Sequence, residues 1–579
     1  MKKPSLAASA PRRPHSEMEI VRLVWLAIFV SVFSFLFYYR NGDVLLYGDA
    51  VAHINIARRV FDSKTPGPLQ LGTVWLPLPH LLILPFIVSK KLWQSGAGGS
   101  IPSMAGFVFG VLGLFRLVRV GFKRGAEKDD RVTIGAWIAA LIYAANPNLM
   151  YMQATAMGES LYLAFFIWAV AFFAEFARGR DKAVRALTKC GWCVAAACLT
   201  RYDGWFLAAV LVGVAILQIP FLAKEARNGA PSSPVLLREN GSEASAVPIS
   251  KLRSALVKFI LLAAAGPVLW LGYNAAVYRN PLEFSNGPYS AKAIERDSAT
   301  VNPAKGSLPA AGSYFLKVAE LNVGATNWFG RAWLALAVIG SVVALWLKRG
   351  RVLLLLWTPL PFYALSIAYG GVPIFVPTWW PFSLYNVRYG LQLLPALIVF
   401  SIFGIASIVE WAAKIPGVKD SWKRWEGGAT LFAILALASA SYTAVWRAEP
   451  ICYREAFVNS RGRIALDSQL AKWVESLPRD STLLMYLGQH AGILERAGIP
   501  LRRDISEGNH RVWKRPDDPD GLWERALADP AKYADYVIGF EGDPVWKAAQ
   551  AHHLTAVVEI HTLGQPRAAI FLGGKEENR

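Results

Sequence analysis

The fold is decided by residues 20–53, where the apolar run IVRLVWLAIFVSVFSFLFYY (20–39) leads into the polar motif YGDAVAH (47–53). A helix of about twenty apolar residues crosses the hydrocarbon core of a bilayer. Asp49 follows that run closely, so the sequence places a carboxylate at a membrane surface. His53 stands four residues later, which puts both side chains on one face if this part is helical. The simpler alternative is that Asp49 only caps a short helix.

The composition indicates a polytopic membrane protein. The chain of 579 residues is 54% hydrophobic, contains 22 Trp and has a mean hydropathy of +0.32. One soluble core cannot bury that much apolar surface. The net charge of +20 is dispersed over short loops between apolar runs. Proteins that bind nucleic acid concentrate such charge in one stripe, so no nucleic-acid partner is expected.

The basic clusters predict the topology, because cytoplasmic loops are enriched in Lys and Arg. All clusters lie inside if an even number of spans separates successive ones, a condition that about eleven crossings satisfy. The clusters are at 2–22, 116–131, 178–189, 224–258, 348–351 and 414–424. The apolar runs are 20–39, 101–115, 133–150, 159–177, 190–200, 204–222, 255–277, 331–347, 352–370, 389–409 and 428–446. The further run 76–88 contains three prolines and is predicted to be re-entrant or interfacial.

Three parts follow from this topology. Residues 1–19 form a cytoplasmic N-terminal tail, and residues 20–446 form an α-helical transmembrane bundle with a first outer loop at 41–100. Residues 447–579 are predicted to be a small outward-facing α/β domain with strands near 483–486, 536–539 and 556–560. No small-residue cleavage site follows the first run, so this run is expected to remain as an anchor. The predicted location is the plasma (inner) membrane, with the C-terminal domain periplasmic or extracellular.

Polar residues far apart in sequence fall on the outer side of this topology. They are Asp49, Glu159, Arg201, Asp203, Tyr289, Lys292, Arg388 and Tyr389. Ionisable groups at membrane depth are costly and usually face an interior cavity, so we expect a shared site. Taken singly, Arg201 or Arg388 has a simpler explanation, since a long basic side chain can extend to the interface.

The order of these motifs resembles the GT-C membrane glycosyltransferases, in particular bacterial proteins akin to protein mannosyltransferases and lipid A aminoarabinose transferases. The resemblance covers roughly residues 20–400. It rests on Gly48-Asp49-Ala50 with His53, Trp75-Leu76-Pro77-Leu78-Pro79-His80, Asn146-Pro147 with Glu159, and Asn386-Val387-Arg388-Tyr389-Gly390 before Leu393-Leu394-Pro395-Ala396. Mannosyltransferases usually carry two adjacent acids where this chain has Asp49-Ala50, which leaves the second carboxylate to Glu159 or Asp62.

The resemblance implies a GT-C-like fold and the transfer of a sugar from a polyprenyl-phosphate carrier to an acceptor at the outer face. Asp49 is expected to act as general base, because an acceptor hydroxyl is a weak nucleophile until its proton is taken. Glu159 is the second expected catalytic carboxylate. The expected substrate-binding residues are His53, His80, Arg201, Tyr289, Lys292, Arg388 and Tyr389. A guanidinium can grip two phosphate oxygens, and a divalent cation held by Asp49 and Glu159 is the alternative source of positive charge.

The partners implied are a lipid-linked sugar donor, membrane lipid, and a protein, lipid or glycan acceptor that the sequence does not select. A transporter or lipid flippase is an alternative, but its ionisable groups would lie near the bilayer midplane rather than at one surface. A non-catalytic envelope assembly protein is another, although so many spans exceed what an anchor needs. Trp379, Trp380 and Tyr385 fit either a stacking surface for sugar or isoprenoid or an ordinary interfacial aromatic belt.

Overall fold

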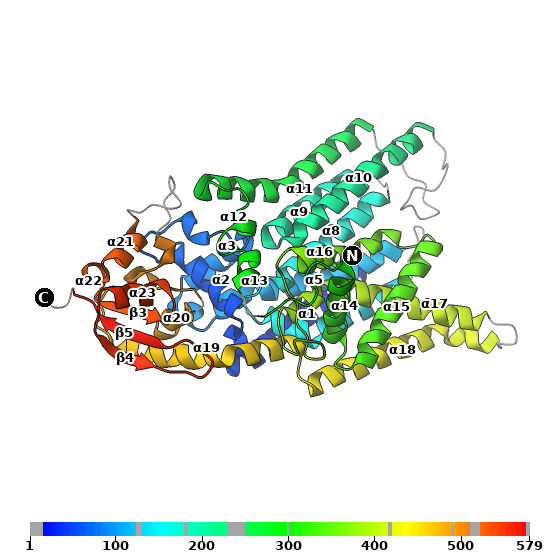
Figure 1. Cartoon of the computed structure of the whole chain (residues 1–579). Coiled ribbons are helices and arrows are strands. Elements are labelled where there is room, and N and C mark those ends of the chain that lie inside the picture. Colours follow the sequence, from blue (N-terminus) through cyan, green and yellow to red (C-terminus); the bar gives the residue numbers. More distant parts are fainter. Residues whose placement is uncertain are drawn as a thin grey trace, which may run out of the picture.

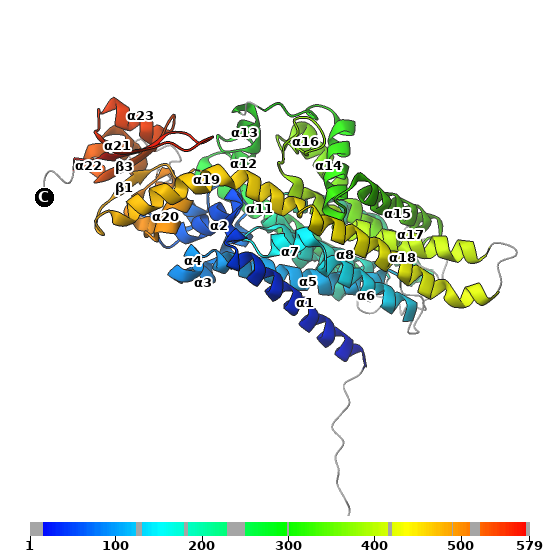
Figure 2. The same ribbon diagram turned by 90° about the horizontal axis from the view of Figure 1, so that it is seen from below.

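The computed structural model describes residues 15–122, 130–178, 183–228, 249–297, 300–414, 420–488, 490–509 and 521–574. These residues form an elongated helical bundle that ends in a small sheet (Figure 1). The first helix, α1 (His15–Arg40), runs along one edge of the bundle and projects beyond it at its N-terminal end (Figure 2).

Eight segments of the described residues are long and apolar enough to cross a membrane, and a bent helix pair makes up to nine. The eight are α1, α5 (Ala97–Phe122), α8 (Glu159–Ala177), α11 (Ile249–Tyr278), α15 (Asn327–Trp346), η3 (Arg351–Trp357) with α16 (Pro359–Tyr369), η4 (Val387–Leu393) with α17 (Leu394–Ala413), and α18 (Asp420–Arg447) with α19 (Ile451–Ser476). The bent pair is α6 (Asp130–Ala144) and α7 (Pro147–Gln153), at 63°. The chain is therefore a multi-pass membrane protein.

Two helices account for the difference from the expected eleven crossings. One is α9 (Ala183–Thr200), which is not among the candidate spans. The other is α10 (Asp203–Asn228), whose apolar stretch Asp203–Gln218 is too short to count as a candidate span. Basic and hydroxyl side chains in α9 lower its hydropathy, yet it is a helix packed within the bundle. The number eleven therefore stays a prediction.

The proline-rich run of the loop between α1 and α5 forms the short helix α3 (Pro77–Ile87), with Pro77 in its first turn and Pro85 inside it. Its 11 residues extend about 16 Å, roughly half of the hydrocarbon thickness. The same loop contains α2 (Gly48–Arg59) and α4 (Lys90–Gln94). The segment between α11 and α15 contains α12 (Glu283–Asn286), α13 (Ala291–Asp297) and α14 (Leu308–Val323).

The C-terminal part is a five-stranded mixed sheet with helices. Its order is β2-β1-β3-β5-β4, in which β1 runs parallel to β2 and β3, whereas β5 is antiparallel to β3 and β4. The strands are β1 (Leu483–Met485), β2 (Asp504–Ile505), β3 (Tyr536–Phe540), β4 (Ala556–Ile560) and β5 (Ala568–Leu572), and the helices are α20 (Gly492–Ala497), α21 (Leu522–Ala528), α22 (Pro530–Tyr533) and α23 (Pro544–Ala551). The three strands predicted from the sequence, β1, β3 and β4, are confirmed.

Strands β1, β2 and β3 are buried throughout, whereas the edge strand β4 is mostly exposed, and the two faces of the sheet join different cores. Successive side chains of a strand point to opposite faces. Leu484 and Val537 accordingly pack in a separate cluster with Trp523 of α21 and Val545 of α23. Leu483 and Met485 belong instead to the large core that also includes residues of the membrane helices. The C-terminal domain is thus continuous with the bundle, and α19 leads from α18 into it (Figure 2).

Candidate functional site

Asp49 lies in the first turn of α2 and forms a close ion pair with Arg388 of η4. Arg388 Nη2 donates to Asp49 Oδ2 at 2.6 Å, across 339 positions of sequence. The Asp49 side chain is 38% exposed and that of Arg388 only 9%. Tyr47 rather than Asp49 occupies the N-cap position of α2. Helix capping therefore does not explain the role of Asp49. In its ion pair with the buried Arg388, Asp49 is the partner that is accessible to solvent.

Two further carboxylates surround the Arg388 guanidinium. Glu159 Oε1 lies 3.3 Å from Nε, and Glu455 Oε1 lies 3.5 Å from Nη1. These carboxylates are 1% and 2% exposed. A buried charge is tolerated only when it is paired and hydrogen-bonded. Each nitrogen of the guanidinium thus faces its own acidic residue, and only Asp49 among them reaches solvent.

Arg201 extends the cluster from the corner between α9 and α10. Its Nη1 donates to Glu159 Oε1 at 2.9 Å, so Glu159 links both arginines. Arg201 Nε lies 3.3 Å from Asp203 Oδ1. The Tyr363 hydroxyl closes this group, because it accepts from Arg201 Nη2 at 2.9 Å and donates to Asp203 at 3.1 Å.

Tyrosine rings form cation–π contacts with both guanidinium groups. The Tyr389 ring centroid lies 4.9 Å from Arg201 Cζ and 5.0 Å from Arg388 Cζ. The Tyr47 ring lies 5.1 Å from Arg388 Cζ. Cation–π contacts of this kind are stronger where water is excluded. They restrict the rotation of the two cations, so the guanidinium planes are preset before a ligand arrives.

His53 and His80 form a buried pair next to this cluster. His53 Nδ1 and His80 Nε2 are 2.8 Å apart, and the His53 ring also contacts Trp75 at a centroid distance of 5.3 Å. Burial lowers the pKa of His53 from its usual value, although Asp49 and Glu159 act in the opposite direction. A neutral imidazole carries one N–H, so one ring donates and the other accepts, and the pair can serve as a hydrogen-bonding wall of the site.

Three other residues singled out from the sequence have different neighbours. Tyr289 interacts with Tyr486 of the C-terminal domain. Lys292 lies in α13, where its backbone approaches Gly371. Asp62 pairs with Arg58 at 2.8 Å and with Arg502 at 3.2 Å, whereas Glu159 reaches both arginines of the cluster. Glu159 is therefore the better placed second carboxylate, and binding roles for Tyr289 and Lys292 stay predictions.

The sequence missed one central residue, Glu455. It follows the last apolar run, so the sequence pattern places its helix in the C-terminal domain alone. Only tertiary packing shows that the start of α19 lies against η4 and the residue before α2. The sequence does not single out Tyr47 or Tyr363 either. Tyr47 begins the motif YGDAVAH (47–53), which is a usable signal, whereas Tyr363 lies in an apolar run that gives none.

The site retains unmet hydrogen-bonding capacity. Within the described residues, Arg388 Nε and Glu159 Oε2 are buried without a hydrogen-bond partner. Buried polar groups are normally satisfied, and catalytic hydrogen bonds often tighten only when substrate binds. Among the same residues, no group of three or more His, Cys, Asp or Glu is arranged to hold a metal ion. The cation between Asp49 and Glu159 is the Arg388 guanidinium.

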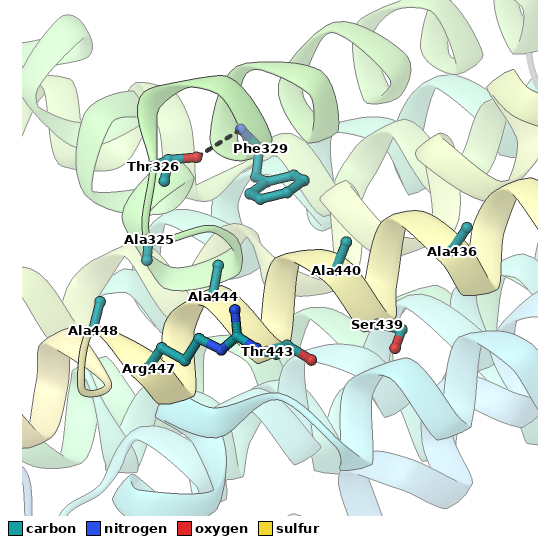
Figure 3. A pocket seen from close by; sticks show the side chains of 10 residues that line it. All are labelled: Ala325, Thr326, Phe329, Ala436, Ser439, Ala440, Thr443, Ala444, Arg447 and Ala448. Atoms are coloured by element: carbon teal, nitrogen blue, oxygen red, sulfur yellow. Dashed lines mark hydrogen bonds between the residues drawn. The ribbon is translucent and has the colours of Figure 1, made fainter.

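A separate open groove of about 700 Å³ lies between the start of α15 and the second half of α18 (Figure 3). Ala436, Ala440 and Ala444 recur every four residues along α18, and Ala448 follows directly after its end, so this side of the helix carries no side chain beyond Cβ. The remaining lining residues are Ala325, Thr326, Phe329, Ser439, Thr443 and Arg447. The groove is thus a consequence of small residues on one helix face.

Comparisons with known proteins agree with the architecture. No family model matches the sequence, and no curated protein matches it. The crystal structure of ArnT from Cupriavidus metallidurans with undecaprenyl phosphate is similar with a TM-score of 0.53 and 13% identity, over 96% of this chain and 98% of that one. The apo structure of the same ArnT gives 0.51 and 14%. The oligosaccharyltransferase AglB from Archaeoglobus fulgidus gives 0.46 and 11%, over 91% of this chain and 70% of that one.

The likeness to ArnT extends over both the helical bundle and the C-terminal sheet, since it leaves out only a small part of either chain. At this level of identity the shared property is the fold. The chain therefore shares the fold of ArnT, which confirms the GT-C-like helical bundle with a small C-terminal α/β part that the order of its sequence motifs predicted.

Proposed function

We propose that this protein is a membrane glycosyltransferase that moves a sugar from a polyprenyl-phosphate carrier to an acceptor at the outer face. The observation that carries the proposal is the Asp49–Arg388 pair, a half-exposed carboxylate bonded to a buried guanidinium in an otherwise enclosed cluster. The ArnT structure of the same fold contains undecaprenyl phosphate. A carboxylate beside phosphate-binding groups is the chemistry that transfer from such a lipid needs.

The reaction divides between these two side chains. Asp49 accepts the proton of the acceptor hydroxyl or amide while the acceptor atom attacks the anomeric carbon of the sugar. The bond between that carbon and the phosphate oxygen breaks, and the lipid phosphate leaves with the electron pair. Arg388 and Arg201 stabilise the charge that develops on the phosphate, because they are preset hydrogen-bond donors in an enclosed site.

Donor binding and base activation are coupled in this scheme. Arg388 Nη2 is the nitrogen that Asp49 occupies at 2.6 Å. A phosphate oxygen competes with Asp49 for the same nitrogen, since both are anions that accept charge-assisted hydrogen bonds. When the phosphate takes Nη2, Asp49 loses this hydrogen bond and becomes a stronger base for the acceptor.

The two guanidinium groups take the place that a divalent cation would have in the alternative scheme. Hard cations prefer several oxygen ligands, and Arg388 already bridges the two carboxylates that would hold one. We expect transfer by protein dialysed against EDTA to match that of untreated protein. Loss of activity that Mg²⁺ or Mn²⁺ restores would show instead that an ion supplies the charge.

The test is donor turnover by purified protein in proteoliposomes that contain acceptor-bearing envelope extract. A panel of undecaprenyl-phosphate-linked hexoses and pentoses is offered, and release of undecaprenyl phosphate is measured. Wild type should consume at least one donor, whereas Asp49→Asn should be slower by about 10² or more because the carboxamide cannot take a proton. Binding of undecaprenyl phosphate should survive the substitution.

The matched control is Asp297→Asn, an exposed carboxylate of the outer loop that pairs only with its neighbour Arg296 among the described residues. Its turnover should equal wild type. Near-normal turnover by Asp49→Asn would remove the base assignment. Failure of wild type both to bind undecaprenyl phosphate and to consume any donor would remove the proposed function.

A further inference from the structure

The start of α19 carries a carboxylate that joins the two segments forming the Asp49–Arg388 pair. Glu455 Oε1 accepts from the Asn386 backbone N–H at 2.5 Å, and Oε2 accepts from the Tyr47 hydroxyl at 2.8 Å. Its Oε1 also lies 3.5 Å from Arg388 Nη1. Both oxygens of one buried side chain are therefore used, each on a different part of the site.

The two partners are the residues that begin the site-bearing elements. Tyr47 is the N-cap of α2, the helix that carries Asp49. Asn386 is the N-cap of η4, which carries Arg388, and it has a left-handed φ of 57°. Asn is one of the few non-glycine residues that adopt this region readily, so the turn into η4 suits the residue that occupies it. The hydrogen bond that the Asn386 N–H donates to Glu455 holds that backbone at the point where η4 starts.

The same helix holds the α2 segment a second time, two turns further on. Arg463 Nη2 donates to the Leu46 carbonyl at 2.9 Å, and Arg463 pairs with Asp467 at 3.3 Å. Asp467 in turn contacts His490 of the C-terminal domain at 3.0 Å. Glu455 is thus linked to His490 through Tyr47, the adjoining Leu46 backbone, Arg463 and Asp467, which connects the membrane site with the C-terminal domain.

We infer that Glu455 is a positioning residue, through which the C-terminal domain sets the geometry of the Asp49–Arg388 pair. The expected effect of Glu455 on turnover rests on the proposed function. Its role in fixing Tyr47, Asn386 and Arg388 does not depend on that function. Glu455 does not face solvent, so it acts through Tyr47, Asn386 and Arg388 rather than on substrate. The C-terminal domain is in this view a part of the transferase site and not an appended module.

The substitution Glu455→Gln tests the inference in two ways. It removes the negative charge that faces Arg388. It also leaves a single carbonyl oxygen to accept from both the Asn386 N–H and the Tyr47 hydroxyl. Hydrogen–deuterium exchange should rise at the amides of residues 47–52 and 385–390. The kcat for donor turnover should fall by about ten- to a hundredfold, as small misplacements of reacting groups do. The KM for the donor should stay equal or fall, because the phosphate meets one competitor fewer at Arg388.

The matched control is Glu475→Gln, an exposed position of the same helix, which should change neither exchange nor turnover. Tyr47→Phe is the milder second variant if Glu455→Gln does not fold. It should raise exchange at 47–52 and leave 385–390 as in wild type, because only the hydroxyl bond is lost.

The outcomes separate this inference from the proposed function. Unchanged exchange in both segments, or raised exchange with wild-type kcat, overturns the positioning role. Wild type that consumes no donor, together with raised exchange in Glu455→Gln, removes the proposed function and leaves the structural linkage in place.

Discussion

At the scale of single residues, the cluster is defined by an imbalance of charge. Two guanidinium groups, Arg201 and Arg388, share the carboxylates of Asp49, Glu159, Asp203 and Glu455. The acidic groups are in excess, so an incoming phosphate gains nothing from net charge. It must instead take specific hydrogen bonds away from a carboxylate. Asp49, the most exposed of these, is the partner that can be displaced at the smallest cost.

This exchange predicts a large effect at Arg388. In Arg388→Lys the charge remains but the planar fork is lost, and an ammonium cannot face three acceptors in the same way. We expect the Kd for undecaprenyl phosphate to rise by roughly tenfold or more, since a hydrogen bond to a charged group contributes about 1.5–3 kcal/mol. Lipid binding to purified protein measures it.

The control for this prediction is Arg331→Lys, an exposed arginine near the start of α15. An arginine that merely reaches the interface is replaced by lysine without loss, so its binding curve should match wild type. Indistinguishable curves for Arg388→Lys would reassign Arg388 to that interfacial role and move the phosphate site toward Arg201.

At the scale of elements, close contacts between helices depend on small residues. A Cβ on Gly340 of α15 would collide with the Phe400 carbonyl oxygen of α17, and one on Gly404 would lie 2.5 Å from the Leu336 carbonyl oxygen. Membrane helices associate through such close backbone approach, because lipid provides no hydrophobic drive between them. The crossing of α15 and α17 therefore rests on two glycines.

Gly340→Ala should lower the thermal unfolding midpoint of the detergent-solubilised protein. The added methyl group must push the helices apart, and such overpacking costs about 1–3 kcal/mol. Gly272→Ala in α11 is the control, because a Cβ there meets nothing within 4 Å. It should be neutral or slightly stabilising, since alanine favours helix. Equal midpoints for the two variants would contradict the packing explanation.

The contact between α20 and α2 predicts a pH dependence. Asn55 of α2 donates to the buried Glu495 carboxylate at 3.0 Å. Burial raises the pKa of Glu495 to about 8, although Asn55, Arg496 and Arg463 act against this and Asp467 adds to it. The folded state therefore holds a proton that the unfolded state loses near its ordinary pKa of about 4.3. The stabilisation of the folded state by protonated Glu495 is complete at a pH below the unfolded pKa of about 4.3. It is lost as the pH rises through the folded pKa of about 8.

We expect the unfolding midpoint of wild type to decline between about pH 5 and pH 8 and to change less above that range. Glu495→Gln mimics the protonated side chain and should reduce the slope. Glu475→Gln, exposed on α19, should keep the wild-type slope. A Glu495→Gln profile parallel to wild type would show that another group carries the dependence.

At the scale of the whole molecule, the membrane bundle and the C-terminal sheet form one body. One buried core includes residues of α5, α8 and α17 together with Leu483 and Ile538 of the sheet. The helix α19 spans both parts and carries contacts to each. Removal of the C-terminal domain would therefore expose apolar surface and release the start of α2, so the two parts are expected to unfold together.

The orientation in the membrane is predicted from the basic loops and can be tested by cysteine labelling. In a background without the four native cysteines, Arg185→Cys should react only after the membrane is permeabilised, whereas Lys305→Cys and Gln550→Cys should react with an impermeant reagent from outside. All three positions are exposed, so accessibility of the side chain does not limit the reaction. Labelling of intact cells at position 185 would reverse the topology.

The sequence by itself determined the membrane class, the helical runs, three of the five strands and the order of motifs that indicates a GT-C fold. Each of these depends on local composition or period, which a linear pattern records. It also nominated Asp49, Glu159, Arg201 and Arg388, because ionisable residues beside apolar runs stand out. Tertiary structure alone decided which of them meet. Arg388 pairs with Asp49 across 339 positions, and Glu455 enters the site because α19 packs against η4. Such contacts arise from the packing of helices distant in sequence, and no local period encodes them.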